Sequence, residues 1–213
     1  MDLERFRAVL GKRSTPARFK VDRYVEDVPS MLQECYVAEV TRRGKVFTGD
    51  KEAEAHIQKA AYWLVNPQTK TSLLLLGSVG NGKTTLATAI CRLISILYGS
   101  PYKSEQKHVT AVKAIQIPEI VKQDPDRWER ITKSEMLFVD DFGTENVTVK
   151  SWGNEISPVT EMLYYRYDHQ LFTILTSNLT IEDLGTRYGE RIADRMAEMF
   201  DRIPFSNPSY RHQ

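Results

Sequence analysis

Residues 73–85 read LLLLGSVGNGKTT and decide the fold. Four consecutive leucines, Leu73 to Leu76, predict a strand that is buried on both faces, as in a parallel sheet. The next eight residues, Gly77–Thr84, fit the pattern G-x-x-x-x-G-K-[ST], whose glycines allow backbone N–H groups to turn towards phosphate oxygens. Apolar residues then recur at helical spacing from Leu86 to Leu97, so the N-terminus of a helix faces the same anion. The stretch predicts a nucleotide-binding α/β protein.

Two side chains of this loop have chemical roles in that prediction. Lys83 is placed to reach the β- and γ-phosphates as a point charge, and the hydroxyl of Thr84 is placed to ligate Mg²⁺. The loop therefore predicts ATP and Mg²⁺ as ligands. The residues expected to bind the nucleotide are Gly77, Ser78, Val79, Gly80, Asn81, Gly82, Lys83, Thr84 and Thr85.

Length and composition limit what surrounds this loop. The chain has 213 residues, enough for one α/β core with a small accessory segment. Its 29 Lys and Arg residues against 28 Asp and Glu give a formal net charge of +1, so nucleic acid would have to bind a local basic patch. Cys35 and Cys91 lack the spacing of a zinc site or a disulfide framework. Neither a signal peptide nor a membrane span is visible, which predicts a cytoplasmic protein with no membrane partner.

The N-terminal part differs in composition from the rest. We expect an accessory segment over residues 1–50, formed by a basic arm and a helix, and an ATPase domain over 51–213. The arm, residues 1–23, has an excess of basic residues and few apolar ones after Leu10. It is either a solvated, partly disordered segment or one that binds nucleic acid or a partner. Helical periodicity predicts helices near residues 30–40 and over Glu52–Val65.

A second strong signal is the acidic pair after the apolar run Met136–Val139. Asp140 and Asp141 would lie at the carboxyl end of a strand, where open α/β sheets bind ligands. Asp140 is expected to hold Mg²⁺ through water, and Asp141 to orient or deprotonate the attacking water. Another strand is expected over Phe172–Thr176, and Asn178 follows it, close enough to the γ-phosphate to sense it.

The remaining segments give weaker signals. Further predicted elements are a strand at 109–113, helices at 117–123, 158–169 and 188–200, a helical turn at 181–184, a loop over 142–157 and an irregular tail over 203–211. Trp128 lies in the polar run 124–133, where it either stacks on a base or fills the edge of the core. The cations grouped with it as a candidate DNA surface are Lys122, Arg127, Arg130 and Lys133.

With these pieces in order, the chain resembles the AAA+ ATPases of the DnaC/IstB type, the bacterial and phage helicase loaders and transposition helpers. The resemblance covers roughly residues 52–211. It implies an α/β P-loop NTPase fold with a parallel sheet flanked by helices. This chain is expected to depart from larger members in having a short helical N-terminal segment and no full C-terminal lid domain. The matching runs are Gly77–Thr84, Leu137–Glu145 (LFVDDFGTE), Thr173–Leu179 (TILTSNL), Tyr188–Met196 (YGERIADRM) and Ser209–Arg211 (SYR).

The resemblance also implies roles for individual residues. Asn178 matches the sensor-1 residue of the family, and Arg195 matches the arginine finger that completes a neighbouring subunit's site. Arg191 is a second candidate for the finger, and Arg211 matches the sensor-2 arginine. The acidic pair departs from the family's usual Asp-Glu, which makes Asp141 a weaker base.

The function implied is that of an ATP-hydrolysing DNA-replication accessory protein, a loader that binds a replicative helicase and single-stranded DNA. Composite sites imply an ATP- or DNA-dependent homo-oligomer with slow turnover in the absence of partners. The run Gly153-Asn154-Glu155 resembles most the DnaC-like proteins of mobile elements and phages. One alternative is a transposition helper on duplex DNA. Another is a small-molecule or nucleotide kinase, which is disfavoured because no lid with phosphate-gripping arginines follows the loop.

Overall fold

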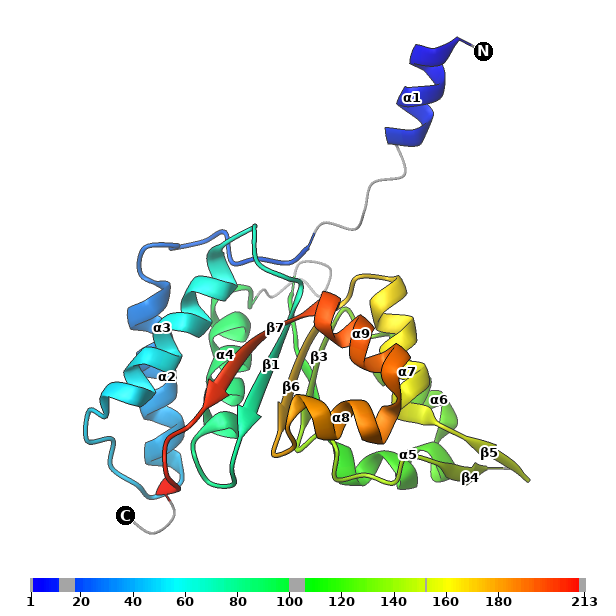
Figure 1. The fold of residues 1–213 in the computed structure, drawn as a ribbon. Coiled ribbons are helices and arrows are strands. Elements are labelled where there is room, and N and C mark those ends of the chain that lie inside the picture. Colours follow the sequence, from blue (N-terminus) through cyan, green and yellow to red (C-terminus); the bar gives the residue numbers. More distant parts are fainter. Residues whose placement is uncertain (1, 12–17, 100–105, 152, 211–213) are drawn as a thin grey trace.

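A computed structural model describes residues 2–11, 18–99, 106–151 and 153–210. Its centre is a five-stranded sheet in the order β2-β3-β6-β1-β7, and every neighbouring pair is parallel (Figure 1). All five strands therefore end at the same edge of the sheet. The strands are β1 (Ser72–Gly77), β2 (Thr110–Lys113), β3 (Met136–Asp140), β6 (Phe172–Ser177) and β7 (Phe200–Phe205).

Helices cover both faces of the sheet, and alternate strand residues face opposite layers. In β1, Leu73 and Leu75 belong to the core under one set of helices, whereas Leu74 belongs to the core under the other. The first set is α2 (Val28–Arg42), α3 (Lys51–Val65) and α4 (Lys83–Leu97). The second set is α5 (Ile117–Gln123), α6 (Pro125–Lys133), α7 (Pro158–Asp168), α8 (Ile181–Tyr188) and α9 (Glu190–Met199), with a short 3₁₀ helix at Ala114–Gln116.

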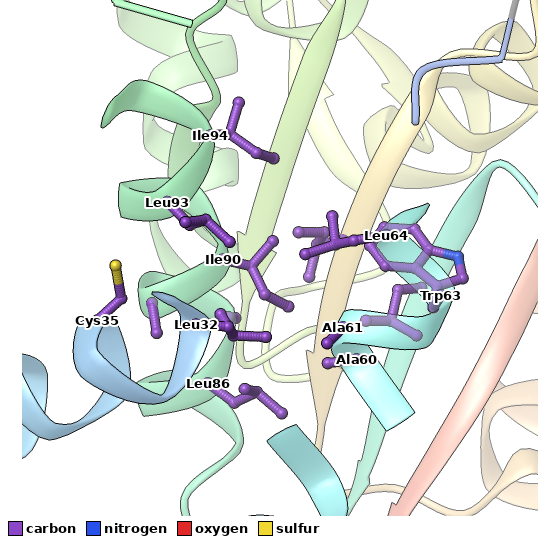
Figure 2. Packing of buried hydrophobic residues seen from close by; sticks show 14 of the residues in the cluster. Leu32, Cys35, Ala60, Ala61, Trp63, Leu64, Leu86, Ile90, Leu93 and Ile94 are labelled. Carbon is purple, nitrogen blue, oxygen red and sulfur yellow. The ribbon is translucent and has the colours of Figure 1, made fainter. Parts of the chain in front are cut away.

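The helix α2 is part of the first core layer. Figure 2 shows Leu32 of α2 lying with Leu64 of α3 and with Leu86 and Ile90 of α4. Each of these four side chains is buried. Residues on both sides of position 50 therefore share one core, while the division into segments 1–50 and 51–213 stays a prediction.

The sequence left two alternatives for the basic arm, a solvated segment or one that binds nucleic acid or a partner, and in the structure its last residues pack on the body. It contains the helix α1 (Leu3–Gly11), and residues 18–23 pack on the body. The ammonium of Lys20 donates to Trp63 O (2.8 Å), Thr69 Oγ1 (2.6 Å) and Lys70 O (3.0 Å), and burial lowers the pKa of Lys20 to about 8. Val21 N donates to Leu64 O at 2.8 Å. A basic residue therefore anchors this segment, because it meets three oxygen acceptors at the end of α3.

The tail forms a strand where irregular chain was expected. β7 pairs with β1 from Ser72↔Phe200 to Gly77↔Phe205. Pro204 has no N–H to donate, but an edge strand tolerates this because one of its sides pairs with no neighbour. The close approach of β7 also explains why position 77 is a glycine, because a Cβ there would lie 2.2 Å from Phe205 O.

Two local expectations also need correction, and one segment for which no element was predicted forms a helix. The loop predicted over 142–157 contains an antiparallel hairpin, β4 (Val149–Ser151) with β5 (Asn154–Ile156). The polar run after Asp124 is helix α6, because the Asp124 carboxylate accepts from Arg127 N (2.8 Å) and caps the helix. The helix expected from Tyr188 begins later, at Glu190, because Gly189 (φ 90°) separates α8 from α9.

Candidate nucleotide-binding site

The phosphate-binding loop joins β1 to α4 at the carboxyl edge of the sheet. Gly82 is the N-cap of α4 and has φ 102°, a left-handed conformation that glycine adopts at little cost. The helix begins at Lys83, so the unpaired N–H groups of its first turn lie at the loop. A helix N-terminus combined with such a loop attracts anions, as the sequence predicted for phosphate.

Lys83 lies at the centre of this loop, and only 4 % of it is exposed. Its Nζ donates to the carbonyl oxygens of Gly77 and Ser78, both at 2.7 Å, and to Asn81 Oδ1 at 3.1 Å. A fourth acceptor, Oδ1 of Asn178 at the end of β6, lies 2.9 Å from Nζ, so the three N–H groups are shared among four oxygens. The structure therefore brings together the lysine and the asparagine that the sequence assigned to the γ-phosphate.

The two residues expected to hold Mg²⁺ are in contact. Thr84 Oγ1 donates to Asp140 Oδ1 at 2.8 Å, across the space between α4 and β3. Thr176 Oγ1 donates to the same oxygen, also at 2.8 Å, and so orients the carboxylate. A hydroxyl and a carboxylate are the hard oxygen donors that Mg²⁺ prefers, so the side chains present fit this ion. Sequence reasoning missed Thr176, although its place at the end of a predicted central strand marked it.

Asp141 is held by its backbone and by the same threonine. It has φ 54°, and its N–H donates to Thr176 Oγ1 at 2.9 Å. Its carboxylate lies 3.5 Å from Asn178 Nδ2, and Asn178 in turn contacts Lys83. Asp140 therefore contacts the loop directly through Thr84, whereas Asp141 is connected to it through Asn178.

Glu145, the second carboxylate of the LFVDDFGTE run, is engaged elsewhere. It is 1 % exposed and accepts a bond from Gly143 N (2.9 Å) and another from Tyr188 OH. Arg187 donates to its backbone carbonyl. These contacts tie the segment after β3 to α8.

Of the two candidate arginines of α9, Arg195 contacts α7. The guanidinium of Arg195 lies 4.8 Å from the ring centre of Tyr164 and 5.3 Å from that of Tyr167, and it donates to Arg191 O (3.4 Å). Arg191 is exposed. Within residues 2–11, 18–99, 106–151 and 153–210, neither side chain contacts the loop of its own chain. Arg211 lies outside the described residues.

The candidate DNA surface is partly neutralised. Lys133 bonds to Glu129, and Arg130 lies 3.9 Å from Asp124. Trp128 is half-buried and packs against the core under α5 to α9, which favours its interpretation as a core-edge residue. Among the helices described, none has the length and apolar character that crossing a membrane requires.

Comparisons with known proteins agree with this geometry. Residues 47–213 match the family of IstB-like ATP binding proteins. Comparison with curated proteins gives no match.

Among solved structures, the chain is similar to the DnaC helicase loader, with a TM-score of 0.59 and 20 % identity over 75 % of this chain and 93 % of that one. It is also similar to DnaI, with a TM-score of 0.57 and 23 % identity over 82 % and 94 %. For the AMPPCP-bound DnaA from Aquifex aeolicus, the TM-score is 0.53 with 16 % identity over 74 % and 48 %. The chain therefore belongs to the family of IstB-like ATP-binding proteins and has the fold of the DnaC/IstB-type AAA+ ATPases.

Proposed function

We propose that the chain hydrolyses ATP and acts as a helicase loader in DNA replication, binding a replicative helicase and single-stranded DNA. ATP hydrolysis is proposed from one observation: hydrogen bonds join Lys83 to Asn178, and Asn178 to Asp141, at one end of the sheet. A phosphate sensor placed between the loop lysine and a carboxylate is suited to couple the γ-phosphate to hydrolysis.

In this mechanism the loop N–H groups and Lys83 bind the phosphates. Thr84 and Asp140 would hold Mg²⁺, which supplies charge neutralisation on the phosphate oxygens when bound. Asp141 accepts a hydrogen bond from the attacking water and orients it. Asn178 contacts the γ-phosphate.

The arginine finger belongs to a neighbouring subunit in this proposal. Arg195 lies on α9 with its guanidinium against the rings of Tyr164 and Tyr167, and no described contact joins it to the loop of its own chain. Arg191, exposed one turn earlier, is the second candidate, and Arg211 is proposed as the sensor-2 arginine. Site sharing of this kind requires an ATP- or DNA-dependent homo-oligomer.

The partners are proposed from the fold that the chain shares with the DnaC helicase loader. The family match keeps one alternative open, a transposition helper that binds duplex DNA. Mass photometry with ATP, with and without a hexameric replicative helicase and single-stranded DNA, tests the choice. A helicase complex that depends on ATP supports the loader. Filaments on duplex DNA without any helicase complex would refute the loader and establish the alternative.

A further inference from the structure

The rear of the phosphate-binding loop is held by residues from the end of the chain. Asn81 Nδ2 donates to Phe205 O at 3.1 Å, and Asn207 Nδ2 donates to Asn81 O at 3.0 Å. Tyr210 N donates to Gly80 O at 2.9 Å. Asn81 and Asn207 are 1 % and 3 % exposed, so both asparagines are locked inside the fold. Three hydrogen bonds therefore tie the loop to residues 205–210.

This tail segment is itself anchored at the start of α3. The hydroxyl of Tyr210 donates to Asp50 Oδ2. Asp50 is also the N-cap of α3, because its Oδ1 accepts from Glu52 N at 3.1 Å. The hydrogen bond from Tyr210 is the main cause of the lowered pKa of Asp50. One carboxylate thus fixes both a helix and the tyrosine that contacts the loop.

The ring of Tyr210 also lies against the last glycine of the loop. A Cβ at Gly82 would be 3.5 Å from this ring and 2.8 Å from the hydroxyl of Tyr36 in α2. Burial raises the pKa of Tyr36 to about 12. Two tyrosines, from α2 and from the tail, therefore confine the backbone where α4 begins.

We propose that Tyr210, held by Asp50, is a positioning residue that preorganises the phosphate-binding loop and so sets its affinity for nucleotide. Phosphate binding needs several N–H groups to converge in one backbone conformation, and ordering a loop on binding lowers affinity. Because Tyr210 N bonds to Gly80 O, a displaced Tyr210 frees the loop segment that carries those N–H groups. The inference rests on nucleotide binding at this loop, and it assigns Tyr210 and Asp50 no contact with the nucleotide itself.

The test removes the anchor without removing the ring. Tyr210→Phe deletes the bond to Asp50, and Asp50→Ser keeps a capping oxygen for α3 on a side chain too short to hold Tyr210. Titration with a fluorescent ATP analogue and Mg²⁺ should give binding roughly three- to tenfold weaker for each variant, the effect of losing one hydrogen bond. The double variant should bind no more weakly than the weaker single variant, since both changes remove the same bond.

The chain offers a matched control in a second tyrosine–aspartate pair. Tyr98 OH donates to Asp22 Oδ1 at 2.6 Å, at the far end of α4, ~22 Å along this 15-residue helix from the loop. Tyr98→Phe should lower the unfolding temperature of the nucleotide-free protein as Tyr210→Phe does, but leave nucleotide affinity unchanged.

Amide hydrogen exchange adds a measurement that a change in overall stability alone would not alter. Nucleotide should slow exchange at the Tyr210 amide in the wild type, by reciprocity between the two sites, and less so in Asp50→Ser. If the wild type binds the analogue and both anchor variants bind it equally well, or weaken only as much as Tyr98→Phe, the inference is wrong. If the wild-type protein does not bind the analogue, the proposal that this loop binds nucleotide is wrong, and that outcome differs from a failure of the inference about Tyr210.

Discussion

Glu145→Gln should lower stability while sparing hydrolysis, which would separate this residue from Asp141. The carboxylate of Glu145 is buried and receives two donors, Gly143 N and Tyr188 OH. Its backbone carbonyl receives a third, from Arg187. The contacts with Tyr188 and Arg187 tie the segment after β3 to α8, and the bond from Gly143 lies within that segment. None of these three contacts involves the phosphate-binding loop.

The size of the effect follows from these contacts. Glutamine has the same shape, and it can keep both bonds if its oxygen accepts from Gly143 and its amide donates to the oxygen of Tyr188. Both bonds then become neutral, and a hydrogen bond to a charged group contributes about 1 kcal/mol more than a neutral one. The loss is about 2 kcal/mol for the pair of bonds, which for a chain of this size lowers the unfolding temperature by roughly 4–8 °C.

Asp141→Asn is the matched comparison. Asparagine adopts positive φ at least as readily as aspartate, so the backbone of this residue (φ 54°) should be retained. Loss of a group that orients or deprotonates water should lower turnover about 10²–10⁴-fold at unchanged unfolding temperature. Thermal unfolding of the nucleotide-free proteins and ATPase rates at saturating ATP measure both quantities. If Glu145→Gln keeps the wild-type unfolding temperature and abolishes hydrolysis, the catalytic carboxylate is Glu145 and this reasoning is refuted.

Lys83→Ala should abolish binding of a fluorescent ATP analogue, and wild-type affinity in that variant would contradict the assigned site. Mixing inactive Arg195→Ala with inactive Lys83→Ala should restore ATPase activity, because one interface then pairs an intact loop with an intact finger; fingers contribute about 10³–10⁵-fold. No rescue, with specific activity independent of dilution, would argue against a shared site. Trp128→Ala should leave single-strand affinity intact if the tryptophan fills the core edge, whereas a large loss would establish stacking. Arg166→Met should destabilise by about 2–4 kcal/mol in urea denaturation, because its buried guanidinium serves four oxygen acceptors; an unchanged midpoint would contradict this.

Local patterns predicted the elements that carry the chemistry. The leucine run, the glycine loop and the acidic pair each lie within a few consecutive residues, and the structure confirms β1, α4 and β3 at those places. The expected helices over 52–65 and 158–169 also agree with α3 and α7. In these stretches, periodicity and burial coincide, so the sequence alone is informative.

The features that the sequence could not predict depend on contacts between segments that lie far apart along the chain. β7 is a strand because its backbone pairs with β1, whose residues lie about 130 positions earlier, and Pro204 argued against a strand in any local analysis. No local pattern distinguishes Lys20 from a solvated cation, because its three acceptors lie 43 to 50 residues away in the sequence. The capping carboxylate of Asp124 was local, and its signal for α6 could have been recognised.

The two sides of the phosphate-binding loop also differ in how far the sequence predicted their contacts. Its front contacts Asp140 and Asn178, and Asn178 in turn contacts Asp141; these residues belong to motifs, since reacting groups need particular side chains. Its rear meets the tail through backbone atoms of Gly80 and Tyr210 and through the side-chain amides of Asn81 and Asn207. Tyr210 lies in the SYR run, but nothing in that run shows which part of the chain it contacts. Substitutions that change turnover should therefore lie at the carboxyl ends of β3 and β6 and at the proposed arginine finger on α9. Substitutions that change nucleotide affinity without touching the nucleotide should cluster in the tail and at the start of α3.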